Sequence, residues 1–229
     1  MRDSQRPPVL AHQRFAAQRS RFEAMSLADR FGAIHDVNLW GAETSVSGLG
    51  SEANATAALA RQLPLLLRKL AVKTLLDAPC GDAGWIAGID LRGIRYVGID
   101  IVDALVVENT ARHHALGTFL AGDITQDPLP AADAILCRDC LVHLSFANII
   151  DAVANFRRTG ARWLITTTFP ELECNNDCED GDWRALNLEK APFCWRPPIE
   201  LLNEQCDEAG GGWRDKSLGV WDLHHALEQ

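Results

Sequence analysis

Five short apolar segments, four of which end in an acidic residue, alternate with helical segments through the middle of this chain. The β-type segments are KTLLD, RYVGID, TFLAGD, DAILCRD and RWLITTTF, at residues 73–77, 95–100, 118–123, 133–139 and 162–169. The apolar residues between them, at 83–89, 103–116 and 145–156, follow helical spacing. This alternation predicts a mostly parallel sheet covered by helices on both faces, with right-handed crossovers. We therefore expect a doubly wound α/β fold with six to seven strands.

Residues 1–72, which precede this core, are predicted to form accessory helices and a covering loop. Ser26 is a candidate N-cap of one helix. The loop, residues 41–51, is rich in glycine and hydroxyl side chains, and Ser51 at its end is a candidate cap for the next helix. Pro64 predicts a kink or restart in that helix.

The segment after the core begins with a long irregular stretch at residues 170–197, which is typical of a lid or binding loop. Residues 198–229 predict a helix near 198–208 and a last strand near 217–223. With the core at 73–169, the whole chain, 1–229, is predicted to be a single domain.

The composition excludes several classes of protein. Among 229 residues, 47% are hydrophobic, which is enough for a sizeable core, and no apolar run is long enough to cross a membrane. Lys and Arg number 22 against 31 Asp and Glu, a net charge of −9 that argues against a nucleic-acid partner. The seven cysteines are an odd count, and no signal-like apolar stretch lies near the N-terminus, so we expect reduced thiols and a cytoplasmic protein. The expected oligomeric state is a monomer or a homodimer.

The acidic residues at the strand ends predict a binding site. In open α/β sheets the ligand lies beyond the carboxyl ends of the strands, where Asp77, Asp100, Asp123 and Asp139 are expected. Gly81, in the turn after Asp77, permits close backbone approach. Asp100 follows Asp77 by 23 residues, at the position from which a carboxylate can accept hydrogen bonds from ribose hydroxyls. The pattern indicates a nucleoside ligand.

Four motifs, LLDAPCGDAGW, YVGID, AGDI and DAILCRDCLVHLS, resemble those of the class I methyltransferases that use S-adenosyl-L-methionine. RFGAIHDVNLWG, SVSGLGS, ITTTF and DWRALNL extend the resemblance, over roughly residues 26–223, to a narrower bacterial group without a settled substrate. The resemblance implies a Rossmann-like fold with a seven-strand-type sheet. Pro79 and Ala83 depart from the glycines of the first motif, and a nicotinamide dehydrogenase would need a GxGxxG spacing that this turn lacks.

The resemblance also implies roles for individual residues. Asp77, Cys80 and Gly81 would line the methionine end of the cofactor, Asp100 would hold the ribose, and Asp123 with Ile124 would bracket the adenine. Cys137 and Arg138 would face the methionine moiety through backbone atoms, and the covering loop would fold over the site. The full set of expected cofactor-binding residues is Trp40, Ser47, Gly50, Ser51, Asp77, Ala78, Cys80, Gly81, Asp82, Trp85, Asp100, Ile101, Asp123, Ile124, Cys137 and Arg138.

The predicted acceptor is a small polar molecule, with a sugar or glycan hydroxyl favoured for O-methylation. His143 is a candidate base, because an unperturbed imidazole has a pKa of about 6.5. Asp139 could orient His143 or act as the base itself. The alternative role of His143 is packing at the start of the next helix. Loop residues that combine hydrogen bonding with an aromatic platform are expected to bind the acceptor, namely Thr168, Asn176, Asp177, Trp183, Arg184 and Asn187. The alternative is a solvated acidic loop anchored by Trp183.

Other readings remain open on the sequence alone. They are a non-catalytic module that binds S-adenosylmethionine, and N-methylation of a small molecule or protein. The segment NNDCEDGD departs from an EF-hand, and the pairs Cys137–Cys140 and Cys174–Cys178 lack the setting of a zinc site, so no metal is predicted, although Mg²⁺ held with Asp139 is an alternative.

Overall fold

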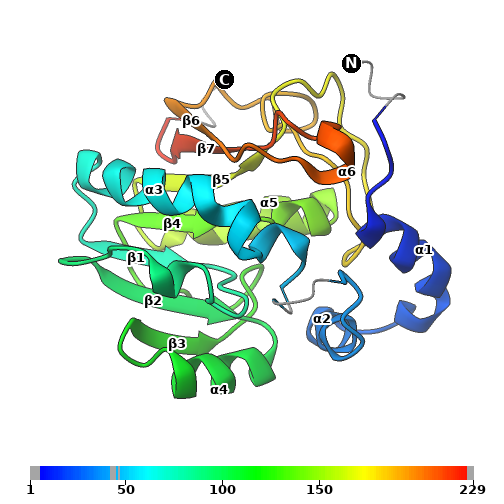
Figure 1. The fold of residues 1–229 in the computed structure, drawn as a ribbon, viewed down its shortest axis with the longest axis horizontal. Coiled ribbons are helices and arrows are strands. Elements are labelled where there is room, and N and C mark those ends of the chain that lie inside the picture. Colours follow the sequence, from blue (N-terminus) through cyan, green and yellow to red (C-terminus); the bar gives the residue numbers. More distant parts are fainter. Residues whose placement is uncertain (1–5, 42–44, 46, 226–229) are drawn as a thin grey trace.

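A computed structural model of the chain describes residues 6–41, 45 and 47–225, and its centre is a seven-stranded sheet in the order β3-β2-β1-β4-β5-β7-β6 (Figure 1). The first five strands are parallel to their neighbours, while β7 pairs antiparallel with β5 and β6. The expected doubly wound, mostly parallel sheet is therefore confirmed. The strands are β1 Thr74–Asp77, β2 Arg95–Asp100, β3 Gly117–Ala121, β4 Ala134–Cys137, β5 Trp163–Thr168, β6 Glu200–Asn203 and β7 Ser217–Asp222.

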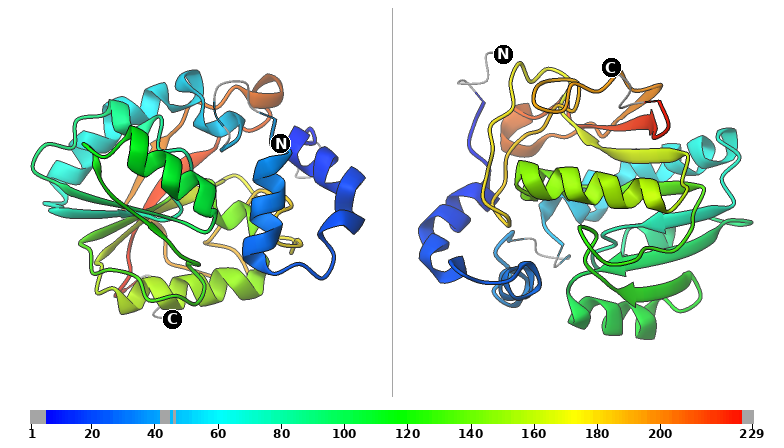
Figure 2. Two further views of the ribbon diagram at one scale, coloured as in Figure 1. Left: turned by 90° about the horizontal axis from the view of Figure 1, so that it is seen from below. Right: turned by 180° about the vertical axis from the view of Figure 1, so that it is seen from behind.

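Helices cover both faces of the sheet. Figure 2 shows α3 (Ala53–Lys69) and α4 (Asp103–Arg112) on one face and α5 (Phe146–Arg158) on the other. The leucine stripe of α3 packs on Leu75 and Leu136, whereas α5 packs its apolar side on the opposite face of the same strands. Alternation of side chains along each buried strand therefore supplies two hydrophobic cores.

Two N-terminal helices, α1 (Leu10–Phe22) and α2 (Leu27–Asp36), lie beside the sheet rather than over either face (Figure 1). They have a small core of their own around Phe15, Phe22 and Ile34. Ser26 caps α2 as predicted, since its hydroxyl accepts a hydrogen bond from the N–H of Asp29. No helix among the described residues is both long and apolar enough to cross a membrane.

Three local predictions differ from the structure. The cap preceding α3 is Glu52, without a side-chain bond, because the Ser51 hydroxyl instead donates to the carbonyl of Ser47. Pro64 lies inside a continuous α3, and between β1 and β2 there is only the short 3₁₀ turn η3 (Ile86–Gly88). The two other 3₁₀ turns are η2 (Leu49–Ser51) and η4 (Leu141–His143).

The helix predicted near 198–208 was wrong, because that segment contains the edge strand β6. The pairing of β6 with β7 buries Leu202, whereas Leu201 stays exposed, and the backbone hydrogen bonds of the ladder override a short, ambiguous apolar pattern. The only helix after it among the described residues is the short α6 (Glu208–Gly211).

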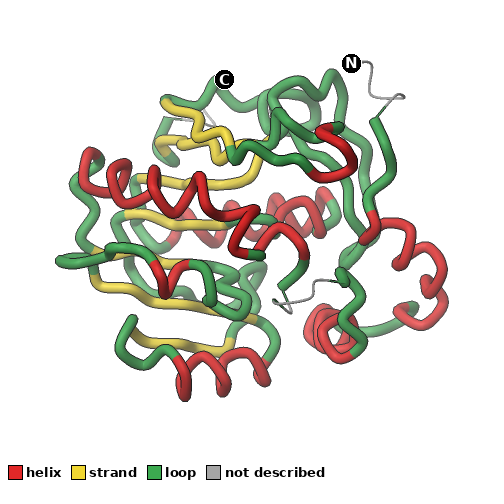
Figure 3. Tube along the Cα trace, in the orientation of Figure 1, coloured by secondary structure: helices red, strands yellow, loops and turns green. Residues whose placement is uncertain are grey.

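The stretch 170–197 is irregular, as expected, and runs as loop throughout in Figure 3. Several of its polar side chains hold backbone in place. Asp180 and Asp177 accept hydrogen bonds from the N–H groups of Ser145 and Phe146 at the start of α5, and Asn187 ties the loop to itself. Two of the acidic residues of this loop therefore serve the N-terminus of a helix, where negative charge is favoured.

Candidate active site

Two adjoining cavities lie at the carboxyl ends of the parallel strands. The first has a volume of about 970 Å³ and opens where the strand order reverses between β1 and β4, the usual ligand position in such sheets. The second has a volume of about 570 Å³. Trp40, Ser47, Asp139 and His143 line both, so these four residues form a shared wall. Ligands in the two cavities would therefore both be in contact with this shared wall.

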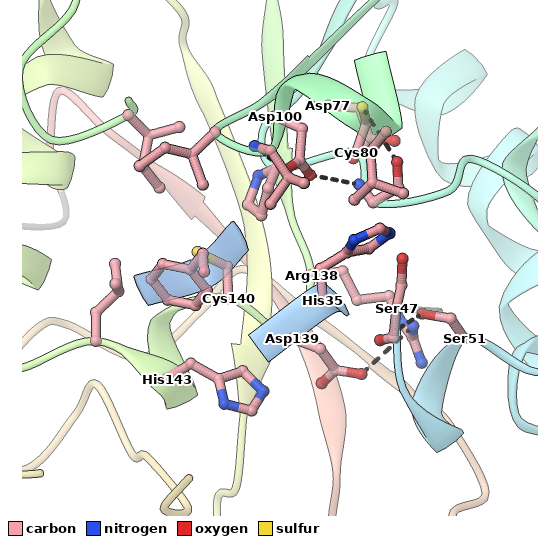
Figure 4. Close-up of a pocket in the computed structure, with 18 of the residues that line it drawn as sticks. His35, Ser47, Ser51, Asp77, Cys80, Asp100, Arg138, Asp139, Cys140 and His143 are labelled. Atoms are coloured by element: carbon pink, nitrogen blue, oxygen red, sulfur yellow. Dashed lines mark hydrogen bonds and ion pairs between the residues drawn. The ribbon is translucent and has the colours of Figure 1, made fainter. Parts of the chain in front are cut away.

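Strand-end carboxylates line one side of the first cavity, with His143 and Asp139 opposite them (Figure 4). Asp100 accepts hydrogen bonds from the N–H groups of Gly81, at 2.9 Å, and Val102, at 3.0 Å. Asp77 accepts one from the hydroxyl of Tyr96 at 2.7 Å. Burial raises the pKa of Asp77 to about 7, against the opposing hydrogen bond from Tyr96, and the pKa of Asp100 to about 6, against the backbone N–H donors.

The covering loop closes over the glycine turn through short contacts. The Ser47 hydroxyl accepts from the N–H of Asp82 at 2.8 Å, and the Ser45 hydroxyl donates to the Asp82 carboxylate at 2.6 Å. Gly81 has a positive φ of 55°, and a Cβ there would lie 2.4 Å from the Ser47 oxygen. Only glycine lets the loop approach this closely.

Most of the expected cofactor residues line the first cavity. Those that do are Trp40, Ser47, Ser51, Asp77, Cys80, Gly81, Trp85, Asp100, Ile101, Asp123, Ile124 and Arg138. Four others lie elsewhere: Gly50 lines the second cavity, Ala78 and Cys137 are buried beneath the site, and Asp82 bonds to Ser45. The sequence reasoning missed Leu27, Phe31 and His35 of α2, whose helical periodicity gave no sign that one face lines a cavity.

Asp123 is committed to its own turn. One carboxylate oxygen accepts from the N–H and hydroxyl of Thr125, and the other accepts from Gln126. Asp123 nevertheless lines the first cavity together with Gly122 and Ile124.

Four charged side chains form a buried ion cluster at the ends of β4, β6 and β7: Arg138, Asp139, Glu204 and Lys216. The Arg138 guanidinium donates to Glu204 at 2.5 Å and to the carbonyl of Gly50 at 2.7 Å. Lys216 donates to Asp139 at 2.6 Å and lies 3.5 Å from Glu204. Although burial alone would raise the pKa of Asp139, Lys216 and Arg138 hold it well below its usual range. Asp139 is therefore an ionised, tightly held carboxylate rather than a proton acceptor near neutral pH.

His143 ends η4 and is buried, and its imidazole packs against the Trp40 ring at a tilt of 35°, with 4.6 Å between the ring centres. Its Nδ1 lies 2.7 Å from the carbonyl oxygen of Asp182. Because a carbonyl only accepts, Nδ1 carries the proton and Nε2 is an acceptor. Burial lowers the pKa of His143 to about 4, so the imidazole is neutral at physiological pH.

Aromatic rings dominate the second cavity. The rings of Trp183 and Trp213 meet edge to face, with 4.9 Å between their centres. The ring centre of Phe169 lies 5.9 Å from that of Trp183 and 5.6 Å from that of Trp213. Trp40 completes the aromatic lining, and the polar lining includes Asp139, His143, Glu208 and Lys216. Phe169, Trp213, Glu208 and Lys216 were missed in the sequence, and the last three reach this cavity only because β7 pairs with β5 and brings the C-terminal segment to this edge of the sheet.

The expected acceptor residues are divided by the structure. Trp183 lines the second cavity and also an outer groove of about 1020 Å³, which Asn176, Asp177 and Arg184 line as well. Arg184 donates to the carbonyls of Leu141 and Leu144. Thr168 and Asn187 are buried, bond to loop carbonyls, and line none of these three spaces.

No group of three His, Cys, Asp or Glu side chains among the described residues is arranged to hold a metal ion. None of the seven cysteines, which all lie within the described residues, is in a disulfide, and Cys137 and Cys140 are buried. Burial and the neighbouring Cys137 raise the pKa of Cys140 well above its usual range.

The first cavity fits the nucleoside cofactor that the motifs imply. Each oxygen of Asp100 accepts one N–H and keeps a lone pair, which two ribose hydroxyls can use. Burial raises the pKa values of Asp77 and Asp100, and a cationic ligand such as this cofactor would favour their ionised forms. The volume of the first cavity, the free lone pairs of Asp100 and the acidic lining therefore agree with S-adenosyl-L-methionine as the ligand.

Comparison with known proteins gives the same picture. Residues 76–162 match the family model of a methyltransferase domain, and no curated protein matches the chain. Among solved structures, the 1,6-didemethyltoxoflavin N1-methyltransferase of Burkholderia thailandensis is similar, with a TM-score of 0.59, 16% identity and 96% of each chain covered.

Two further structures share the fold. Magnesium protoporphyrin IX methyltransferase of Synechocystis, solved with bound S-adenosylmethionine, has a TM-score of 0.55 and 12% identity over 87% of this chain and 97% of that one. The methyltransferase domain of bacterial CtHen1 has a TM-score of 0.53 and 12% identity over 73% and 99%. The chain therefore has the class I methyltransferase fold and carries a methyltransferase domain over residues 76–162, for which S-adenosyl-L-methionine is the cofactor.

Proposed function

We propose that the protein transfers a methyl group to a small polar acceptor seated in the second cavity, with a sugar or glycan hydroxyl as the favoured acceptor. The observation that carries the proposal is the wall shared by the two cavities, where Trp40, Asp139 and His143 contact both. Tryptophan faces and carboxylates together suit a ring with apolar C–H faces and polar hydroxyls.

The cofactor supplies a methyl group already activated by sulfonium, so the protein's tasks are alignment, exclusion of water and proton removal. His143 lines both cavities, and the bond from its Nδ1 to the carbonyl of Asp182 leaves Nε2 as a neutral acceptor. As the new C–O bond forms, the acceptor hydroxyl becomes strongly acidic, so an imidazole with a pKa of about 4 suffices to take its proton. Asp139 orients the acceptor through its fixed carboxylate.

The first test is thermal unfolding with S-adenosylhomocysteine or with NAD. A ligand that binds only the folded protein at a hundredfold excess over its Kd raises the Tm by roughly 5–10 °C. We expect this rise with S-adenosylhomocysteine alone. A rise with NAD alone would contradict the cofactor assignment, whereas the acceptor remains to be tested by turnover.

N-methylation of a small amine is a second candidate, favoured by the low pKa of His143, since a neutral amine attacks without a strong base. The His143→Ala variant separates the two. A hydroxyl acceptor should lose turnover, whereas an amine acceptor should keep most of it and lose rate only below the pKa of the amine itself.

A further inference from the structure

The charges around the second cavity leave one carboxylate uncompensated. In the buried ion cluster, two cations, Arg138 and Lys216, face two anions, Asp139 and Glu204, and the four formal charges cancel. Short contacts hold the cluster together, because Lys216 donates to Asp139, and Arg138 donates to Glu204 and to the carbonyl of Gly50. Any further charge on the cavity wall must therefore be balanced by something other than the cluster.

Glu208 is that further charge. It lines the second cavity at the start of α6 and is partly buried. Its carboxylate has no hydrogen bond or ion pair with any part of the chain that the structure describes. Burial raises its pKa, and the field of Lys216 only partly opposes this. A carboxylate in such surroundings gains most from a cationic neighbour.

The rings beside Glu208 provide a second attraction for a cation. Phe169, Trp183 and Trp213 meet edge to face, and Trp40 lies across the same space. Trp213 already holds one cation, since the Arg6 guanidinium lies 5.1 Å from its ring centre. Aromatic faces attract ammonium and guanidinium groups, more strongly where water is excluded.

An anionic acceptor finds no matching partner here. Lys216 is the only Lys or Arg among the described residues that line the second cavity, and it is already bonded to Asp139. A carboxylate or phosphate on the acceptor would meet Asp139 and Glu208 without gaining an uncommitted cation.

We propose that the acceptor carries an ammonium group, which Glu208 and the aromatic rings of the second cavity hold while the methylated atom faces His143. The acceptor class is then a small polar amine, such as an amino sugar. This inference rests on the proposed function, because it concerns what occupies the second cavity.

Binding of matched sugars tests the proposal without requiring turnover. The probes are the methyl glycosides of an amino hexose, its N-acetyl derivative, the parent hexose and the hexuronic acid. Each is titrated calorimetrically into the protein saturated with S-adenosylhomocysteine, at about pH 7, where the hexosamine is still mostly protonated. We expect the amino sugar to bind about tenfold more tightly than the N-acetyl derivative and parent hexose, and the uronate to bind most weakly.

Variants of Glu208 test whether this residue causes the preference for the amino sugar. In Glu208→Gln the difference between amino sugar and hexose should shrink to about twofold, whereas Glu208→Asp should retain most of it. Asp207→Asn is the matched control, since Asp207 is exposed, adjacent in sequence and outside the cavity, and the preference should persist. Equal binding of all probes, no binding of the amino sugar, or a preference unchanged in Glu208→Gln would each overturn the proposal. Failure to bind S-adenosylhomocysteine would instead count against the proposed function.

Discussion

Asp77 and Asp100 show, at the scale of single residues, how burial changes the carboxylates that line the first cavity. Both carboxylates are buried and carry raised pKa values. For Asp77, whose pKa rises from 3.8 to about 7, the folded protein holds a proton that the unfolded chain has lost across this range. The free energy of unfolding of the cofactor-free protein should therefore fall as the pH rises between these values.

The same shift predicts a pH dependence of cofactor binding. Only ionised Asp77 can face the ammonium of S-adenosylhomocysteine, so affinity should increase about tenfold from pH 6 to pH 8. Calorimetric titration at these pH values measures the change. The Asp77→Asn variant should bind weakly with a flat profile, and a flat profile in the wild-type protein would falsify this role of Asp77.

His143 predicts an effect on turnover alone. In His143→Ala, kcat for a hydroxyl acceptor should fall by about a hundredfold or more, while the Kd for S-adenosylhomocysteine stays within about twofold. Because burial lowers the pKa of His143 to about 4, the wild-type kcat should decline only below about pH 5.

The exposed His114 offers a control, since His114→Ala should leave both quantities unchanged. If His143→Ala turned over the hydroxyl acceptor at the wild-type rate, His143 would be left with a packing role against Trp40.

At the scale of elements, the buried ion cluster joins β4 to the two antiparallel strands of the sheet. Because β7 runs against β5, Lys216 at its start lies beside the carboxyl end of β4, where Asp139 has a positive φ of 50°. Gly50 permits this approach, as a Cβ there would lie 2.5 Å from the Asp139 oxygen. The cluster therefore depends on three segments that are far apart in the sequence.

Removing one member of this cluster should be costly. Arg138→Met leaves Glu204 buried without its guanidinium, and we expect a loss of about 3–5 kcal/mol in the free energy of unfolding, measured in urea. Lys216→Met should cost less, since Arg138 still lies 3.4 Å from Asp139.

The exposed pair of Arg162 with Asp222 is a suitable reference, because Arg162→Met should cost less than about 1 kcal/mol. Equal losses for Arg138→Met and Arg162→Met would show that the cluster contributes little to stability.

The elements that the sequence predicted correctly are those with strong local patterns. The five parallel strands and α5 follow from apolar runs and helical spacing, and the acids at the ends of β1 and β2 follow from the fold. The acid at the end of β6 was not foreseeable, because Glu204 acquires its role only through the pairing of β6 with β7. The segment containing β6 was itself predicted as a helix, since an edge strand of four residues carries little periodicity.

At the scale of the whole molecule, the N-terminal segment of residues 6–12 reaches across to the C-terminal part of the fold. Arg6 forms a buried ion pair with Asp215 at 2.7 Å, and His12 lies 2.8 Å from Asp182. Val9, between them, lines both the second cavity and the outer groove. No local pattern indicated these contacts, because they join residues about 170 to 209 positions apart.

Breaking the Arg6 contact should loosen this segment without affecting the cofactor cavity. In Arg6→Ala, amide hydrogen exchange across α1 should accelerate about tenfold, while exchange in the strands of the sheet and the Kd for S-adenosylhomocysteine stay unchanged. Arg19→Ala removes an exposed contact of the same helix with Glu179 and should have no such effect. Slow exchange across α1 in Arg6→Ala would mean that the helix is held by its apolar contacts alone.

The shared wall of the two cavities has a consequence for kinetics. Trp40 and Ser47 belong to the segment that covers the cofactor cavity, yet they also shape the space beside it. The ligand that binds first therefore positions side chains that the second ligand contacts. Substrate addition should be ordered, with the cofactor entering first and the demethylated cofactor leaving last, so that this product competes with the cofactor but not with the acceptor.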